Sequence, residues 1–192
     1  MSDAQATDAQ ATDAQASDAQ AGQAPAGSVS SGAAPRHSNK LPRVLRHYSR
    51  LSRVPFGKWL FARLICFNAP YFATIDPRFI ELRPGLCQVS LRKRRAVHNH
   101  LKTVHAIAMA NLCELAGGML MEVSIPTEMR WIPRGMTIEY LKRAQSSVTA
   151  TARLDKSEWS VGNVGVPVSV NDAQGNEVVR AVITMYVSER RS

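Results

Sequence analysis

One apolar segment, residues 104–121, constrains the fold more than any other part of the chain. Its apolar residues fall around the whole circumference of a helix rather than along one stripe, which predicts a helix buried on all sides. We expect Thr103 to be its N-cap. The apolar residues are Val104, Ala106, Ile107, Ala108, Met109, Ala110, Leu112, Cys113, Leu115, Ala116, Met119 and Leu120. The polar exceptions are His105, Asn111 and Glu114.

The segments on both sides of this helix alternate between apolar and polar residues, which predicts strands. Two strands are expected before the helix, at 71–82 and 86–96, with a turn at Pro84-Gly85. A loop containing Pro126 and Pro133 then leads to four more strands, at 136–144, 147–154, 161–171 and 177–188. Residues 172–176 supply the last hairpin turn. The pattern predicts an α+β fold in which one antiparallel sheet wraps around one central helix.

Residues 41–67 predict two amphipathic helices separated by Pro55 and Gly57. The first has Leu41, Val44, Leu45, Tyr48 and Leu51 on one face, arginines 43, 46, 50 and 53 on the other, and Pro42 at its first position. The second carries Phe56, Trp59, Leu60, Leu64 and Phe67. In the commoner arrangement the apolar stripes pack on the domain and the arginines are solvated. The alternative is a peripheral membrane contact through residues 41–67.

The amino-terminal segment differs from the rest in composition and charge. From Asp3 to Gly22 it consists of four pentapeptide repeats, DAQAT, DAQAT, DAQAS and DAQAG, and then becomes rich in Gly, Ala, Pro and Ser as far as Pro35. We expect residues 1–38 to be a disordered tail and residues 39–192 to form one domain. The first 35 residues hold four aspartates and no basic residue, so the remainder carries +13 of a chain whose net charge is +9.

A strongly basic domain favours anionic partners. Nucleic acid, anionic lipid and a phosphorylated cofactor such as coenzyme A all fit, but nucleic acid ranks last because aromatic residues are few and no recognised motif occurs. Three widely spaced cysteines show no disulfide framework, and no spacing resembles a metal site, so we expect buried thiols, no metal and no cofactor. No signal peptide or membrane span is evident, and the expected location is the cytoplasm.

Candidate chemical groups cluster around the start of the central helix. A carboxylate among apolar residues is costly, so Glu114 is either paired in the interior or a base or nucleophile of raised pKa. His105 lies in the first helical turn, where free N–H groups can polarise a carbonyl, and His98-Asn99-His100 lies just upstream. Nine helical steps separate His105 from Glu114 and place them on opposite faces, so a site using both would span a dimer interface.

Residues 97–108 and 111–118 resemble the loop and central helix of hotdog-fold thioesterases, closest to an uncharacterised branch defined by a domain of unknown function. Further similarity lies in Ala69-Pro70-Tyr71, in Trp131 to Met136 and in Glu139 to Lys142, so that the resemblance spans residues 56–188. In acyl-CoA thioesterases of this fold, a loop Asn and a His are followed by an acid nine residues after the His. Asn99, His105 and Glu114 match these positions, whereas Ala106-Ile107 stand where the family pattern has two glycines.

The resemblance implies that Glu114 of one subunit activates water, or attacks directly, at a thioester carbonyl held near His105 and Asn99 of the other. The substrate would be acyl-coenzyme A or acyl-pantetheine, and the assembly a homodimer or tetramer. The acyl chain would run along the helix past Met109 or Cys113, while Lys142, Arg143 and the run Arg92 to Arg95 are candidates for the phosphates. The implied substrate-binding residues are His98, His100, Ala106, Ile107, Met109, Cys113, Gly117, Gly118, Lys142 and Arg143.

The missing glycine pair also supports an alternative function. Such glycines let a helix start approach a thioester closely, so a chain with Ala106-Ile107 in their place fits a non-catalytic acyl-CoA or lipid binder as well as a hydrolase. Turnover of an acyl-CoA panel distinguishes the two.

Overall fold

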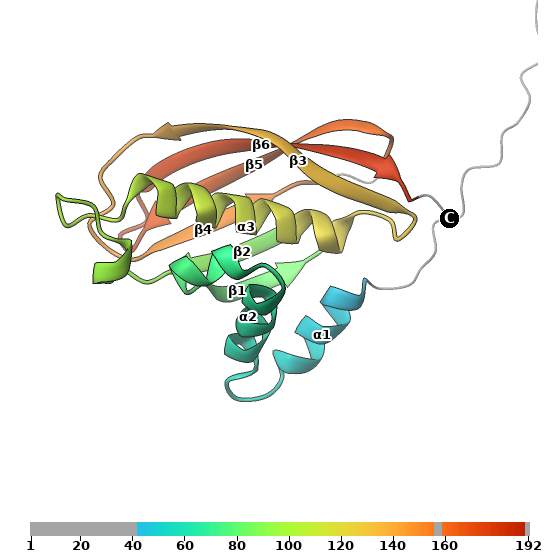
Figure 1. Ribbon diagram of the computed structural model, residues 1–192, viewed down its shortest axis with the longest axis horizontal. Helices are drawn as coiled ribbons and strands as arrows, with labels where there is room; N and C mark the ends of the chain where they lie inside the picture. Colours follow the sequence, from blue (N-terminus) through green and yellow to red (C-terminus); the bar gives the residue numbers. More distant parts are fainter. Residues whose placement is uncertain (1–41, 156–158, 191–192) are drawn as a thin grey trace, which may run out of the picture. The chain divides into compact units, whose positions relative to one another are not determined.

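The computed structural model describes residues 42–155 and 159–190 (Figure 1). The expected amino-terminal tail lies outside the described residues. The helices are α1 (Arg43–Leu51), α2 (Gly57–Asn68) and α3 (Ala106–Ser124), with the short 3-10 helices η1 (Pro70–Ile75) and η2 (Arg95–Val97). The strands are β1 (Arg78–Arg83), β2 (Leu86–Leu91), β3 (Met129–Tyr140), β4 (Val148–Arg153), β5 (Gly162–Asp172) and β6 (Glu177–Glu189).

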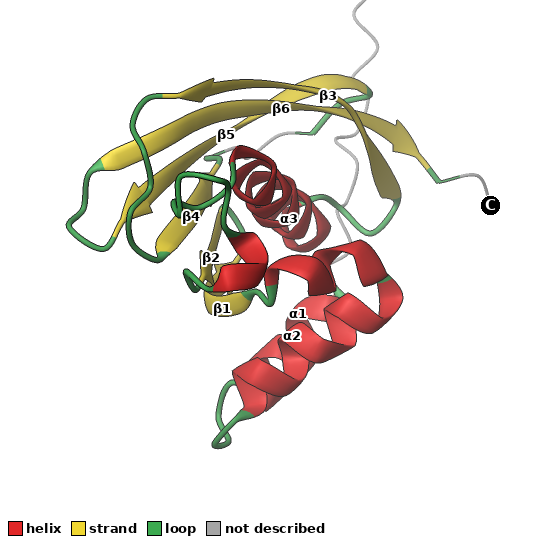
Figure 2. Ribbon diagram, turned by 60° about the vertical axis from the view of Figure 1, so that its left-hand side comes forward, coloured by secondary structure: helices red, strands yellow, loops and turns green. Residues whose placement is uncertain are grey.

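All six strands form one antiparallel sheet, in the order β1-β2-β4-β5-β6-β3. The sheet curves around α3, which contacts every strand (Figure 2). Inward-facing residues of the strands and the buried face of α3 make one hydrophobic core. The α+β hotdog arrangement expected from the sequence is therefore confirmed.

The central helix differs from its prediction in two respects. It begins at Ala106, with His105 as its N-cap, whereas Thr103 is buried in the preceding loop. It is also not buried on all sides. Ile107 and Glu114, which are about two helical turns apart, are both exposed on the same face. The prediction failed because the pattern of apolar residues does not distinguish a helix that its own chain covers on all sides from a helix with one exposed face.

The strand predictions hold in number but not in all boundaries. Residues 70–75 form η1, so the first strand begins at Arg78 rather than at residue 71, and the second ends at Leu91. The third strand begins seven residues earlier than expected, at Met129, and includes Pro133. Proline is tolerated there because β3 lies at the sheet edge and its register with β6 shifts between Pro133 and Gly135.

The two amino-terminal helices are both present, but only α1 packs as expected. Leu45 and Tyr48 of its apolar stripe are buried. The buried face of α2 consists instead of Phe61, Ala62 and Cys66, and the ring of Phe61 packs edge-on against Tyr48 and Phe79 at centroid distances of 5.1 and 5.0 Å. The predicted apolar stripe of α2, from Phe56 to Phe67, is exposed to solvent. The expectation that this stripe packs on the domain is wrong.

Among the described helices, α3 alone is long and apolar enough to cross a bilayer by length and composition. Because 67% of its apolar window is buried inside the domain, it is the core helix of the sheet. The three cysteines are also buried, as expected for small apolar side chains. Burial raises the pKa of the Cys113 thiol to about 12.

Candidate active site

A small pocket of about 160 Å³ lies at the amino-terminal end of α3. It is formed by η1, by η2 and the loop that leads from it to α3, and by the first two turns of α3 itself. Its lining residues are Tyr71, Thr74, Ile75, Ala96, Val97, His98, His105, Ile107, Ala108 and Asn111. The pocket therefore joins two of the predicted imidazoles to polar residues of η1 and α3.

Asn111 is the most deeply buried polar side chain of this pocket, with 6% of its surface exposed. Its amide nitrogen donates to the Thr74 hydroxyl at 3.3 Å, and that hydroxyl donates to the carbonyl of Tyr71 at 2.7 Å. Its Oδ1 atom has no partner among the described residues, and neither does the buried Nε2 of His98. A buried polar atom without a partner costs about 1 to 3 kcal/mol, so this pair suits a bound polar group.

His105 uses its ring to cap α3. Its Nδ1 accepts a hydrogen bond from the backbone N–H of Ile107 at 3.1 Å, and its backbone is extended. The helical arithmetic that placed it opposite Glu114 therefore does not apply, since His105 precedes the helix. The N–H of Ile107 is also less available to a substrate carbonyl than the resemblance implies.

Asn99 organises the loop that leads into the helix. Its Oδ1 accepts from the N–H groups of Leu101 and Thr103 at 3.0 and 3.1 Å, and its amide donates to the Thr103 hydroxyl at 2.9 Å. Lys102 takes a left-handed conformation with φ 59° within this turn. The Asn99 side chain thus holds His98 and His105 at the pocket, while its contact with a substrate stays a prediction.

Glu114 does not line the pocket of its own chain. It lies on the exposed face of α3, three residues after Asn111 and in line with Ile107. Side chains three residues apart on a helix are neighbours, with Cβ atoms about 5 to 6 Å apart. The Cβ atom of Glu114 is therefore near that of Asn111, and its side chain is open to solvent, not enclosed in apolar surroundings as the sequence suggested.

Four of the expected substrate-binding residues lie inside the core. Met109 and Cys113 are buried between α3 and the sheet. A Cβ atom on Gly117 would lie 2.7 Å from Cδ1 of Ile183, and one on Gly118 would lie 3.0 Å from the Trp131 ring. The glycines allow α3 to approach β6 and Trp131 closely, and contact of these four residues with substrate stays a prediction.

The expected phosphate-binding cations lie at the surface. Lys142 and Arg143 follow β3 and are exposed, as is His100 in the loop before α3. Within the basic run, Lys93 donates from Nζ to the Gln145 carbonyl at 2.8 Å, and Arg94 donates to the Thr74 carbonyl at 2.9 Å. Arg92 and Arg95 are exposed. Within residues 42–155 and 159–190, no group of three or more His, Cys, Asp or Glu side chains is placed to hold a metal ion.

Sequence reasoning found the two histidines but missed the η1 side of the pocket. It read residues 71–82 as a strand, which hid Tyr71 and Thr74. Asn111 was noted only as a polar exception in an apolar helix. The signal that points to Asn111 is its amide side chain within an apolar helix, because a buried amide needs hydrogen-bond partners that its neighbours in the sequence do not supply.

Solved structures resemble the chain over most of its length. A structural-genomics target shares 44% identity, covers 77% of this chain and 99% of its own, and gives a TM-score of 0.70. A Pseudomonas aeruginosa protein of unknown function, described as a probable thioesterase, shares 20% identity, with coverages of 71% and 97% and a TM-score of 0.62. A thioesterase from Haemophilus influenzae shares 11%, with coverages of 66% and 87% and a TM-score of 0.58.

The chain therefore has the hotdog fold, which the two neighbours described as thioesterases share. The profile of DUF4442, a domain of unknown function, matches residues 57–187, and the chain belongs to this family. No curated protein matches the chain.

Proposed function

We propose that the protein hydrolyses an acyl thioester of coenzyme A or pantetheine to a free acid and a thiol. The observation that supports this most strongly is the pocket at the start of α3. It holds the unpartnered His98 Nε2 and Asn111 Oδ1, and the open face of the same helix presents a carboxylate, Glu114, to a second copy of the chain. A polar pocket beside a solvent-accessible base is what hydrolysis of a carbonyl substrate requires.

In the proposed reaction, the thioester carbonyl lies at the pocket, where His98 and the positive end of α3 stabilise the developing oxyanion. Glu114 takes a proton from water, and the resulting hydroxide attacks the carbonyl carbon. The carbon–sulfur bond then breaks, and the departing thiolate receives the proton from Glu114. Lys142, Arg143 and the exposed Arg92 and Arg95 are the proposed partners of the cofactor phosphates.

We further propose that two copies assemble the site as a homodimer. Among the described strands, β3 pairs only with β6, so one edge of this 12-residue strand is free. Ile132 and Tyr140 of β3 are exposed, as is Ile107 of α3, and Tyr140 donates to the Ala106 carbonyl at 3.3 Å. Free strand edges with exposed apolar side chains favour pairing with a second copy. Such a dimer would bring Glu114 of one copy towards the pocket of the other.

The test is release of free thiol from a panel of acyl-CoA esters of different chain length by the full-length protein. Mixing two inactive variants, Glu114→Gln and His98→Gln, then tests the shared site. If each site takes Glu114 from the partner, random heterodimers contain one site with neither substitution and regain roughly a quarter of the wild-type rate. A monomeric protein, or no recovery on mixing although each variant dimerises, contradicts the shared site.

A second candidate function is non-catalytic binding of acyl-CoA or lipid. It is favoured by Ala106-Ile107 in place of two glycines and by the His105 ring, which occupies the Ile107 N–H. Saturable binding of acyl-CoA without any thiol release would support this function. Turnover that depends on Glu114 would reject it.

A further inference from the structure

A continuous apolar surface runs along the outer side of α2. We call it the α2 face; it comprises Phe56, Trp59, Leu60, Leu64 and Phe67. We propose that the α2 face docks the protein on a membrane leaflet containing anionic phospholipid. This proposal does not depend on the reaction proposed above, since it concerns different residues.

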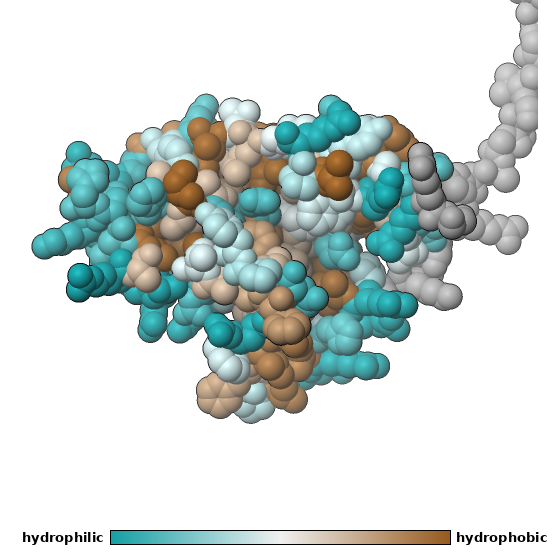
Figure 3. Space-filling model, in the orientation of Figure 1, coloured by the Kyte–Doolittle hydropathy of each residue, from teal (hydrophilic) through white to brown (hydrophobic). Residues whose placement is uncertain are grey.

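The α2 face is unusually exposed for its composition. Phe56 and Phe67 expose 85% and 83% of their surface, and Trp59 exposes 57%. Leu60, Leu64 and Phe67 follow each other at intervals of four and three residues, so they share one side of the helix. Figure 3 shows apolar side chains gathered on the part of the molecule where Figure 1 places α2. A contiguous apolar patch of this kind marks an interaction surface.

The backbone at the start of α2 holds Phe56 outward. Phe56 takes a left-handed conformation with φ 61°, which is strained for a bulky residue. Gly57 follows it so close to the Leu51 carbonyl that no side chain fits there. The turn from α1 into α2 is therefore fixed by packing, and this packing leaves the ring of Phe56 in solvent.

The segment that carries the α2 face has charged residues of one sign. Residues 42–75 contain no Asp or Glu. They contain six cations, Arg43, Arg46, Arg50, Arg53, Lys58 and Arg63, all of them exposed. Aromatic and aliphatic side chains bordered by Arg and Lys are characteristic of helices that lie in the interface of an anionic membrane.

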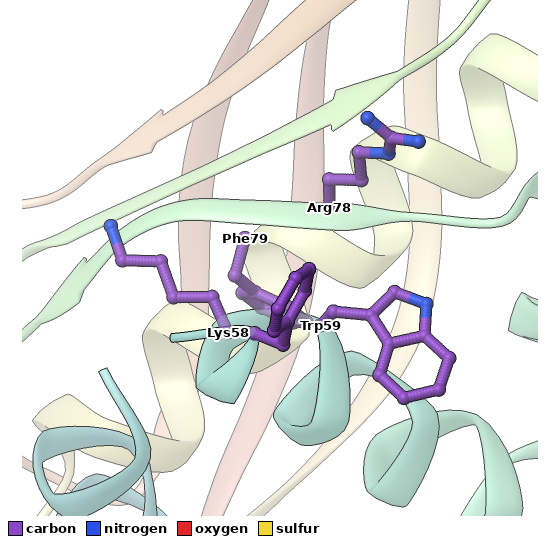
Figure 4. A pocket seen from close by; sticks show the side chains of 5 residues that line it. Lys58, Trp59, Arg78 and Phe79 are labelled. Atoms are coloured by element: carbon purple, nitrogen blue, oxygen red, sulfur yellow. The ribbon is translucent and has the colours of Figure 1, made fainter. Parts of the chain in front are cut away.

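A pocket of about 660 Å³ adjoins the α2 face. Phe56, Lys58 and Trp59 line it from the α2 side, and Arg78 and Phe79 from β1 (Figure 4). Lys58 donates to the Ile80 carbonyl at 2.5 Å, which keeps its cation beside the pocket. Figure 4 shows the Lys58 ammonium and the Arg78 guanidinium pointing to different sides, so this border suits separate anionic headgroups with apolar groups between them.

The same charges argue against a second copy as the occupant. Two α2 faces in contact would bring at least four like charges together, since each copy contributes Lys58 and Arg63 of α2. Like charges in a contact oppose association. A leaflet with anionic headgroups satisfies both the apolar stripe and its basic border.

The experiment is flotation of the full-length protein with vesicles of two compositions. One is phosphatidylcholine alone, and the other contains equal parts of phosphatidylcholine and phosphatidylglycerol. We expect binding to the anionic vesicles, weaker binding in high salt, and little binding to the neutral ones. Equal binding to both compositions, or none to either, overturns the proposal.

Variants localise the contact. Phe56→Ser with Phe67→Ser should weaken binding to anionic vesicles about tenfold or more, because two exposed rings no longer enter the interface. Lys58→Gln and Arg63→Gln should each weaken it about fivefold. Val182→Thr, an exposed apolar residue of β6, is the matched control and should bind as wild type. Unchanged binding by the double variant overturns the proposal. The proposal is also overturned if the wild type forms an oligomer without vesicles and the double variant does not.

Discussion

The two halves of α3 lie under the same sheet but differ in how their side chains are packed and partnered. The carboxyl-terminal half is closed by packing, with Leu115, Leu120 and Met121 buried and Gly117 and Gly118 against Ile183 and Trp131. At the amino-terminal half, Asn111 and His98 of the preceding loop keep polar atoms without partners among the described residues, and Glu114 has an exposed carboxylate. The difference teaches that one helix can stabilise the fold with one half and leave polar groups of the other half accessible to a ligand.

The largest expected difference between the two halves is in stability. Leu120 is completely buried, so Leu120→Ala should lower the free energy of unfolding by about 2 to 5 kcal/mol. Ile107 is exposed, and Ile107→Ala should change it by no more than about 0.5 kcal/mol. Urea unfolding of both variants measures this, and similar losses would remove the contrast.

The close approach at Gly117 gives the next largest effect. Gly117→Val places carbon atoms where Cδ1 of Ile183 lies, and overpacking of this kind costs about 1 to 3 kcal/mol. Gly135→Val is the matched control, since no described atom lies within 4 Å of its Cβ position. The midpoint of urea unfolding should fall for Gly117→Val alone. An unchanged midpoint would show that the core near Ile183 has space for the added side chain.

The buried thiol at the centre of α3 makes stability depend on pH. Burial raises the pKa of Cys113 to about 12, above the value of about 8.5 in an unfolded chain. The folded state therefore favours the protonated thiol, and this stabilisation is complete below about pH 8.5 and is lost as pH rises towards 12. Above pH 9 the wild type should lose about 1.4 kcal/mol per pH unit more than Cys113→Ala. Parallel losses would contradict the burial.

A smaller change in stability than at Leu120 is expected at Asn111, and it should have the opposite sign. Asn111→Leu removes a buried acceptor without a partner and one long hydrogen bond to Thr74. We expect the free energy of unfolding to rise by about 1 kcal/mol while thioester hydrolysis falls. Loss of stability with full activity would show that the amide serves the fold.

The fold was predictable from the sequence because its main features repeat along the chain. Strand alternation, the turns at Pro84-Gly85 and at residues 172–176, and the apolar central segment all agree with one sheet around one helix. The structure of residues 70–75 was not predictable, because a short 3-10 helix and the first residues of a strand can have the same pattern of apolar residues. The exposed side of α2 was missed for a related reason, since an apolar stripe does not say what covers it.

The site was predictable in part. His98 and His105 were found because they lie just before and at the start of the predicted helix, where free N–H groups collect. Asn99 turned out to hold its own loop, and the Asn111–Thr74 contact joins residues 37 positions apart, which no local pattern reveals. The burial of Glu114 was inferred from its neighbours in sequence, whereas its exposure depends on where the sheet ends.

Two carboxylates on α3 allow the most direct test of the account. Glu114 is exposed at the amino-terminal half, whereas Glu122 at the carboxyl-terminal half accepts a hydrogen bond from the Trp131 indole at 3.2 Å. The measurement is the rate of thiol release from acyl-CoA by Glu114→Gln and by Glu122→Gln. The account predicts a loss of roughly 10²- to 10⁴-fold for Glu114→Gln and a nearly unchanged rate for Glu122→Gln. Full activity in Glu114→Gln, or equal losses in both, would contradict it.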